Sequence, residues 1–216
     1  MYFSYGDTEV DYLKRKDKRL GAAIDAIGHV ERELDGDLFS SVVHHIIGQQ
    51  ISTKAQATVW KRLCDEAGGM NAESVGALDV TRLQSSGMTF RKAEHIARFS
   101  TAVREGDIDL RSIERMPDDE AIAALTAIPG IGVWTAEMIL LHCLQRSDVL
   151  SFGDLAILRG MRMLYRHKTI DRRRFERYRK RFSPYGSVAS IYLWAIASGA
   201  IPGMSDPAPS KNRKRD

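Results

Sequence analysis

The spacing of apolar residues is the feature that most restricts how this chain can fold. Apolar side chains recur at intervals of three and four residues along most of the sequence, which is the period that places them on one face of an α-helix. We find no convincing alternating run bounded by hairpin turns, the pattern that indicates a strand. The sequence therefore predicts an all-α fold.

Breaks in this pattern give the expected bounds of the helices. Ser52 or Thr53 can cap one helix start, and Gly68-Gly69 can stop the same helix. Helices are expected over residues 38–47, 53–67, 72–77, 80–84, 91–104, 118–127, 133–145, 154–165, 172–181 and 187–198. The expected domains are an N-terminal extension packed on the body (1–34), a helical lobe (35–116), a second helical lobe (117–203) and a disordered basic tail (204–216).

Composition excludes several classes of protein. The chain has 216 residues, of which 44% are hydrophobic, enough to bury a core. No stretch of about 18 uncharged apolar residues occurs, so we expect a cytoplasmic protein without a membrane partner. Cys64 and Cys143 are the only cysteines, and they can build neither a disulfide framework nor a four-thiolate metal site.

Positive charge is concentrated near the C-terminal end. Between Arg159 and Arg181 stand eleven Lys or Arg residues against only Asp171 and Glu176, which favours binding to a phosphate backbone. The alternative is a solvated helix face. The net charge of +4 is a weaker indication, because part of it lies in the 204–216 tail.

A glycine-rich turn within residues 125–136 is the most informative segment. Gly130 and Gly132 permit positive φ and close backbone approach, which leaves amides at the start of the next helix able to bind a phosphate oxygen. Ile128 and Ile131 can anchor the turn in the core. An ordinary helical hairpin could use the same glycines.

This turn resembles the helix-hairpin-helix motif, and the residues after it extend the resemblance. About twenty residues beyond the hairpin, Asp154 follows a glycine-containing loop and can begin a helix. The order is similar to that of the helix-hairpin-helix (HhH-GPD) DNA glycosylase superfamily. Gly130 to Ala136 match the Gly-Ile-Gly-x-Trp-Thr-Ala stretch of its 3-methyladenine DNA glycosylase II (AlkA-like) branch. The resemblance covers most of residues 35–200 and also involves residues 48–52, 87–93 and 187–194.

The resemblance implies two helical lobes with a DNA-binding cleft between them and a catalytic role for Asp154. Cleavage of the glycosidic bond gives the sugar oxocarbenium character, so a nearby anion and a positioned water are needed. A helix N-terminus stabilises such a negative charge. The alternative is that Asp154 is only a helix cap.

The resemblance also assigns a base pocket and a DNA-binding surface. An alkylated base is rotated out of the duplex and stacks on aromatic rings, for which Trp134 and Trp194 are the first candidates, although a buried aromatic is often only core. Further pocket candidates are Tyr192, Phe152 and Met138. The DNA-binding candidates are Gly130, Ile131, Gly132, Gln49, Gln50, Ile51, Arg91 and Lys92. Gln50 or Ile51 would fill the gap left by the base, and Arg91 and Lys92 could instead be a solvated helix start.

The expected reaction is base removal without strand cleavage. Relatives that also nick the strand carry a nucleophilic lysine where this chain has Trp134, so no Schiff base can form there. No cofactor is expected, although hairpins in relatives hold a monovalent cation on backbone carbonyls. The expected partner is double-stranded DNA with an alkylated purine, bound by a monomer near the nucleoid. The alternatives are a glycosylase for oxidised or deaminated bases, a non-catalytic DNA-binding module and a helical protein-interaction domain.

Overall fold

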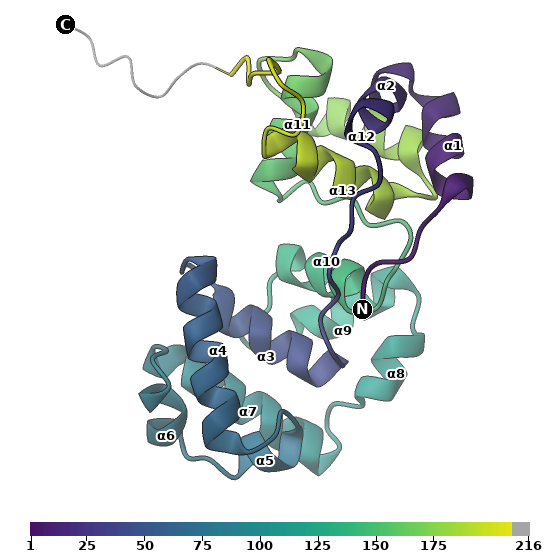
Figure 1. Cartoon of the computed structure of the whole chain (residues 1–216). Helices are drawn as coiled ribbons and strands as arrows, with labels where there is room; N and C mark the ends of the chain where they lie inside the picture. The colour runs from purple at the N-terminus through teal and green to yellow at the C-terminus, as the bar shows by residue number, and fades with distance from the viewer. Residues whose placement is uncertain (209–216) are drawn as a thin grey trace, which may run out of the picture. The chain divides into compact units, whose positions relative to one another are not determined.

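The protein is helical throughout the part that the structure describes. The computed structural model describes residues 1–208, which contain thirteen helices and no strand. One isolated bridge joins Tyr2 and Glu33. The all-α prediction is confirmed, and Figure 1 shows the arrangement of the helices. Within residues 1–208 no helix combines the length and the apolar character needed to cross a membrane.

Contacts between residues divide the chain into two compact units. The first unit joins Met1–Glu33 to the chain from Gln145 onward, and the second is Leu34–Leu144. The expected division differs, because it grouped the glycine turn with the segment of Asp154. In the structure α9 and α10 pack with α8 and α3, so the turn belongs to the second unit.

The first unit is built from both ends of the chain. Its helices are α1 (Asp7–Lys16), α2 (Lys18–Ile27), α11 (Leu155–Tyr165), α12 (Arg172–Phe182) and α13 (Gly186–Ala197). The N-terminal extension packs on the rest of the unit, since α2 contacts α11 and α13. Gly160 allows α11 to approach α13 closely, because any side chain there would meet the backbone of Leu193.

The second unit is one continuous stretch of eight helices. They are α3 (Leu38–Gly48), α4 (Thr53–Ala67), α5 (Ala72–Gly76), α6 (Val80–Ser85), α7 (Phe90–Glu105), α8 (Leu110–Arg115), α9 (Asp118–Thr126) and α10 (Val133–His142). Its core includes the stacked rings of Phe39 and Phe99, whose centroids lie 5.1 Å apart. Side-chain oxygens of Asp37, Ser52 and Thr89 cap the starts of α3, α4 and α7.

Two expectations for the ends of elements differ from the structure. The helix expected over 133–145 ends at His142, and Asp206 is fixed although residues 204–216 were expected to be a disordered tail. The guanidinium of Arg162 donates to both oxygens of Asp206, at 2.9 and 2.5 Å. This ion pair ties the described segment 204–208 to α11. The basic residues expected in the tail, Lys211, Arg213, Lys214 and Arg215, lie outside the described residues.

Candidate functional site

The glycine turn joins α9 to α10 in the second unit. Gly130 has φ +92°, the left-handed conformation that favours glycine. Gly132 has φ −96° and extended backbone, so only Gly130 uses the positive φ that both glycines permit. Ile128 and Ile131 are 2% and 5% exposed, which confirms that they anchor the turn in the core.

The start of α10 carries no side-chain cap. Gly132 is the N-cap residue and offers no side-chain oxygen, and a side chain added at this position would meet nothing within 4 Å. Val133 and Trp134, the first residues of α10, are 59% and 44% exposed. An exposed helix start with a bare backbone cap suits an anion, because its amides and the helix dipole favour negative charge.

The loop between α3 and α4 is tied directly to the turn. The side-chain amide of Gln49 donates to the carbonyl oxygen of Gly130 at 2.7 Å. Gln50, with φ +58°, and Ile51 are both exposed. The structure therefore brings two groups of predicted DNA-binding residues together within one unit, and the backbone of Gly130 forms the link between them.

Lys92 supports this loop through its ammonium group. The ammonium donates to the carbonyl oxygens of Ile47, at 2.8 Å, and Gln49, at 2.6 Å. Burial lowers the pKa of Lys92 from its ordinary value. The sequence suggested a contact between Lys92 and a DNA phosphate and did not indicate these internal bonds. Arg91, the neighbouring candidate, is exposed.

His95 explains why the turn needs glycine at residue 130. The imidazole of His95 lies where a side chain on Gly130 would stand. Because Lys92 and His95 both belong to α7, this helix supports the loop and the turn together.

Two carbonyl oxygens of the hairpin backbone are the candidate ligands of a monovalent cation. The carbonyl oxygen of Gly130 accepts from Gln49, and that of Ile128 accepts from the amide of Ile131 at 3.0 Å. Each carbonyl oxygen has a second lone pair. A cation bound here would use that second lone pair, while the first still accepts the hydrogen bond.

Asp154 begins α11 in the first unit. Its Oδ1 accepts hydrogen bonds from the amides of Ala156, at 2.8 Å, and Ile157, at 2.9 Å. The residue is 7% exposed, whereas the next residue, Leu155, is 81% exposed. The carboxylate is therefore fixed by the helix start and sits next to surface.

Two serines of α13 hold the segment that leads to Asp154. Ser187 accepts from the amide of Val149 at 2.9 Å, and Ser190 donates to the carbonyl oxygen of Val149 at 2.8 Å. Both serines are fully buried. Neither serine was predicted as a site residue, although two serines three residues apart on an otherwise apolar helix are a signal that could have indicated them.

The aromatic candidates of the first unit have different surroundings. The guanidinium of Arg32 lies 4.8 Å from the ring centroid of Trp194, and the ring of Phe152 packs edge-on against Phe175 at 5.1 Å. Tyr192 is 1% exposed and donates to the carbonyl oxygen of Gly28 at 3.1 Å. Burial, followed by the hydrogen bond with Tyr5, raises the pKa of Tyr192.

The pocket candidates are thus divided between exposed and core positions. Trp134 is partly exposed, whereas Met138 is only 3% exposed on the same helix. In the other unit Tyr192 is a core residue and Trp194 is half-buried. These surroundings favour the two tryptophans over Met138 and Tyr192 as surfaces that a base could reach.

Comparison with known proteins agrees with this architecture. Residues 43–184 match the family described as "HhH-GPD superfamily base excision DNA repair protein". DNA-3-methyladenine glycosylase 1 of Schizosaccharomyces pombe is 28% identical over 161 residues, which cover 72% of this chain and 71% of that protein. DNA-3-methyladenine glycosylase 2 of Escherichia coli is 27% identical, and the match spans 73% of this chain but only 57% of that relative.

Solved structures give the same result over a longer stretch. A DNA-3-methyladenine glycosidase from Bacillus halodurans superposes with a TM-score of 0.82 at 35% identity, covering 92% of this chain and 93% of that one. A 3-methyladenine DNA glycosylase of Schizosaccharomyces pombe in complex with abasic DNA superposes with a TM-score of 0.76 at 26% identity, covering 87% and 95%. The chain therefore belongs to the HhH-GPD superfamily of base excision DNA repair proteins, in the branch that contains the DNA-3-methyladenine glycosylases.

Proposed function

We propose that this chain is a monofunctional DNA glycosylase that removes alkylated purines, 3-methyladenine and 7-methylguanine, from double-stranded DNA and leaves an abasic site. It acts as a monomer in the cytoplasm, at the nucleoid. The observation that carries the proposal is a buried carboxylate, Asp154, fixed at the start of α11 in a chain of this family.

Asp154 supplies the negative charge that the reaction needs. As the bond to the base breaks, positive charge develops on the sugar, and a carboxylate held in place stabilises it without reorganising. The amides of Ala156 and Ile157 fix Oδ1. In this proposal the carboxylate also orients the water that adds to the sugar, and the base leaves with the electron pair of the broken bond.

The leaving group determines which bases are removed. An N-alkylated purine carries a positive charge and leaves readily, so it needs no dedicated general acid. A cationic, electron-poor base stacks well on an electron-rich indole. Trp134 and Trp194 are the proposed stacking surfaces, and their partial exposure supports the assignment.

The protein holds the DNA at the turn and the adjoining loop. The amides at the start of α10 bind a backbone phosphate, while Gln50 or Ile51 fills the gap left by the rotated base. The bond from Gln49 to Gly130 keeps the two segments at a fixed spacing. No cofactor takes part in the proposed reaction.

The absence of strand cleavage follows from the side chain at residue 134. Cleavage would need an amine that attacks the sugar and forms a Schiff base. Trp134 offers none, so hydrolysis by water is the proposed course, and the strand stays intact until another enzyme acts.

The test uses the purified chain and three kinds of duplex. The first carries 3-methyladenine or 7-methylguanine, the second carries 8-oxoguanine, and the third carries uracil. We expect release of the methylated bases only, and strand breaks only after alkali treatment. Release confined to 8-oxoguanine or uracil would contradict the proposed substrate. Breaks without alkali, together with covalent trapping by borohydride, would contradict the monofunctional mechanism.

A further inference from the structure

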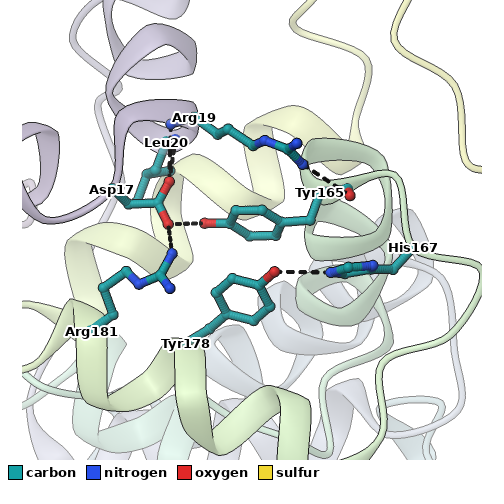
Figure 2. Close-up of polar contacts among 7 residues, drawn as sticks. All are labelled: Asp17, Arg19, Leu20, Tyr165, His167, Tyr178 and Arg181. Atoms are coloured by element: carbon teal, nitrogen blue, oxygen red, sulfur yellow. Dashed lines mark hydrogen bonds and ion pairs between the residues drawn. The ribbon is translucent and has the colours of Figure 1, made fainter.

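A pocket of about 280 Å³ in the first unit lies where the start of α2 meets α11 and α12. Figure 2 shows the polar contacts among Asp17, Tyr165, Arg181 and their neighbours in the lining of this pocket. The lining includes Tyr165, the last residue of α11, whereas Asp154 precedes the first residue of that helix. None of the residues assigned above belongs to the lining. The pocket is dominated by cations and tyrosines: Lys16, Asp17, Lys18, Arg19, Tyr165, His167, Tyr178 and Arg181.

Asp17 is the only carboxylate of the lining, and internal bonds occupy it. Its Oδ1 accepts from the amides of Arg19 and Leu20, both at 3.0 Å. Its Oδ2 accepts from the hydroxyl of Tyr165 at 2.9 Å and the guanidinium of Arg181 at 2.5 Å. Asp17 is 4% exposed. Its charge therefore fixes Arg181 and the start of α2 and does not neutralise the other cations of the pocket.

Three cations at the rim have no carboxylate partner within residues 1–208. Lys16, Lys18 and Arg19 are exposed and form no ion pair within this part of the chain. The ammonium of Lys16 lies 5.4 Å from the ring centroid of Tyr12, and the guanidinium of Arg19 donates to the carbonyl oxygen of Tyr165 at 3.1 Å. Two other lysines, by contrast, are paired: Lys14 lies 2.5 Å from Asp25, and Lys61 lies 2.6 Å from a carboxylate one turn away. The rim therefore concentrates positive charge that the protein does not balance.

The pKa of His167 reflects the positive charge around the pocket. Its Nε2 lies 2.9 Å from the hydroxyl of Tyr178. Burial lowers its pKa, and the nearby guanidinium groups of Arg174, Arg19 and Arg177 lower it further. An anion bound here would oppose these cations.

The shape of the pocket selects a small anion. The rings of Tyr165 and Tyr178 stack on each other with centroids 4.0 Å apart and an interplanar angle of 19°. Both residues are buried. Because each ring covers one face of the other and both residues are buried, neither ring offers an exposed face on which a nucleobase could stack.

We propose that this pocket binds a phosphate group of the DNA backbone, with Lys16, Lys18, Arg19 and Arg181 as the donors. The inference rests on the proposed function, because it takes DNA as the source of the phosphate. The first unit would then have its own phosphate contact, separate from the turn at Gly130 in the second unit. Arg181 is held ready by Asp17, so binding does not have to order that side chain.

The test compares two double variants with the same change of charge. Lys16→Gln with Lys18→Gln removes two unpaired rim cations, and Lys14→Gln with Lys61→Gln removes two paired lysines as the control. Arg181 and Arg19 stay unchanged because they bond to Asp17 and to the Tyr165 backbone. The affinity for an unmodified duplex is measured at several KCl concentrations.

For the rim variant we expect the slope of log affinity against log salt to fall by about one for each lost phosphate contact. The control slope should stay at the wild-type value. Adding the duplex should also raise the pKa of His167, followed by NMR of its ring protons, less in the rim variant than in the control. Equal slopes for wild type and rim variant, or equal losses in both variants, would overturn the proposal.

The same experiment separates this inference from the proposed function. Unmodified DNA tests the pocket without any reaction, and base release from methylated DNA tests the enzyme. A lower slope in the rim variant than in wild type, combined with no base release by the wild-type protein, would overturn the proposed function alone. A protein that releases methylated bases with an unchanged slope in the rim variant would overturn the pocket alone.

Discussion

The role of Lys92 could not be predicted from the residues next to it in the sequence. A lysine at the start of a helix, next to a predicted DNA-binding stretch, suggests a phosphate contact. The structure instead has its ammonium on the carbonyl oxygens of Ile47 and Gln49. Nothing local to Lys92 indicates this, because the two acceptors stand more than forty residues earlier in the chain.

Lys92→Met should loosen the loop of Gln50 while keeping the apolar stem of the side chain. The loss of two charge-assisted hydrogen bonds should lower the unfolding free energy by roughly 1.5–3 kcal/mol. Hydrogen exchange at residues 48–51 should quicken, and base release should slow. Arg91→Met, at an exposed neighbour on α7, is the control for the unfolding free energy and for hydrogen exchange, and it should change neither of these two quantities. Wild-type exchange rates in Lys92→Met would show that the ammonium does not hold the loop.

At the scale of elements, the helices were largely predictable because their signals are local. The caps Ser52 and Asp154, together with apolar periodicity, gave α4 and α11 to within a residue or two. No helix was predicted over Leu110–Arg115, where the structure has α8, or within the N-terminal extension, which forms α1 and α2. α10 ends at His142 although apolar residues continue, and periodicity alone could not show that stop.

The two glycines of the turn should respond differently to alanine. Gly130→Ala places a side chain at positive φ and against His95, and the left-handed conformation alone should cost about 1–2 kcal/mol of unfolding free energy. Gly132→Ala should change stability by less than about 0.5 kcal/mol, because its φ is −96° and the space beside it is open. It should still weaken DNA binding, since the added methyl group lies at the start of α10. Urea unfolding measures the stability difference. Equal losses of stability in both variants would contradict the assigned geometry.

At the scale of the molecule, local sequence patterns did not predict how the chain divides into its two units. The first unit joins residues from both ends of the sequence, and its N-terminal helices pack on α11 and α13. Motif order singled out Asp154 as the candidate carboxylate, and the structure confirms its place at a helix start. Motif order could not predict the tie between Gln49 and Gly130 or the cluster around Asp17, because these depend on contacts between distant residues.

Acid should destabilise the second unit through Asp35 and the adjacent histidines. Burial lowers the pKa of His44 below 6.5, with Asp35 opposing the shift. Burial acts to raise the pKa of Asp35. The imidazole of His45, 3.2 Å away, and the hydroxyl of Ser41, which donates to Asp35 at 2.7 Å, outweigh burial and lower the pKa below 3.8. The unfolded chain thus binds more protons at both sites, so the unfolding free energy should fall as the pH drops below 6.5 and fall again below 3.8. His44→Gln should flatten the first decline in urea unfolding measured against pH. An unchanged pH profile in this variant would refute the role of His44.

The central claim is that the carboxylate of Asp154 drives base removal, and Asp154→Asn tests it most directly. The matched control is Asp171→Asn, because Asp171 caps α12 through the amide of Arg174 at 2.7 Å and has no assigned part in the reaction. Single-turnover release of 3-methyladenine and affinity for an abasic-site analogue are measured for both variants. Asp154→Asn should lower the release rate at least about a hundredfold and largely keep the affinity, while the control keeps both. Full activity in Asp154→Asn, or a parallel loss of activity and affinity, would contradict the account.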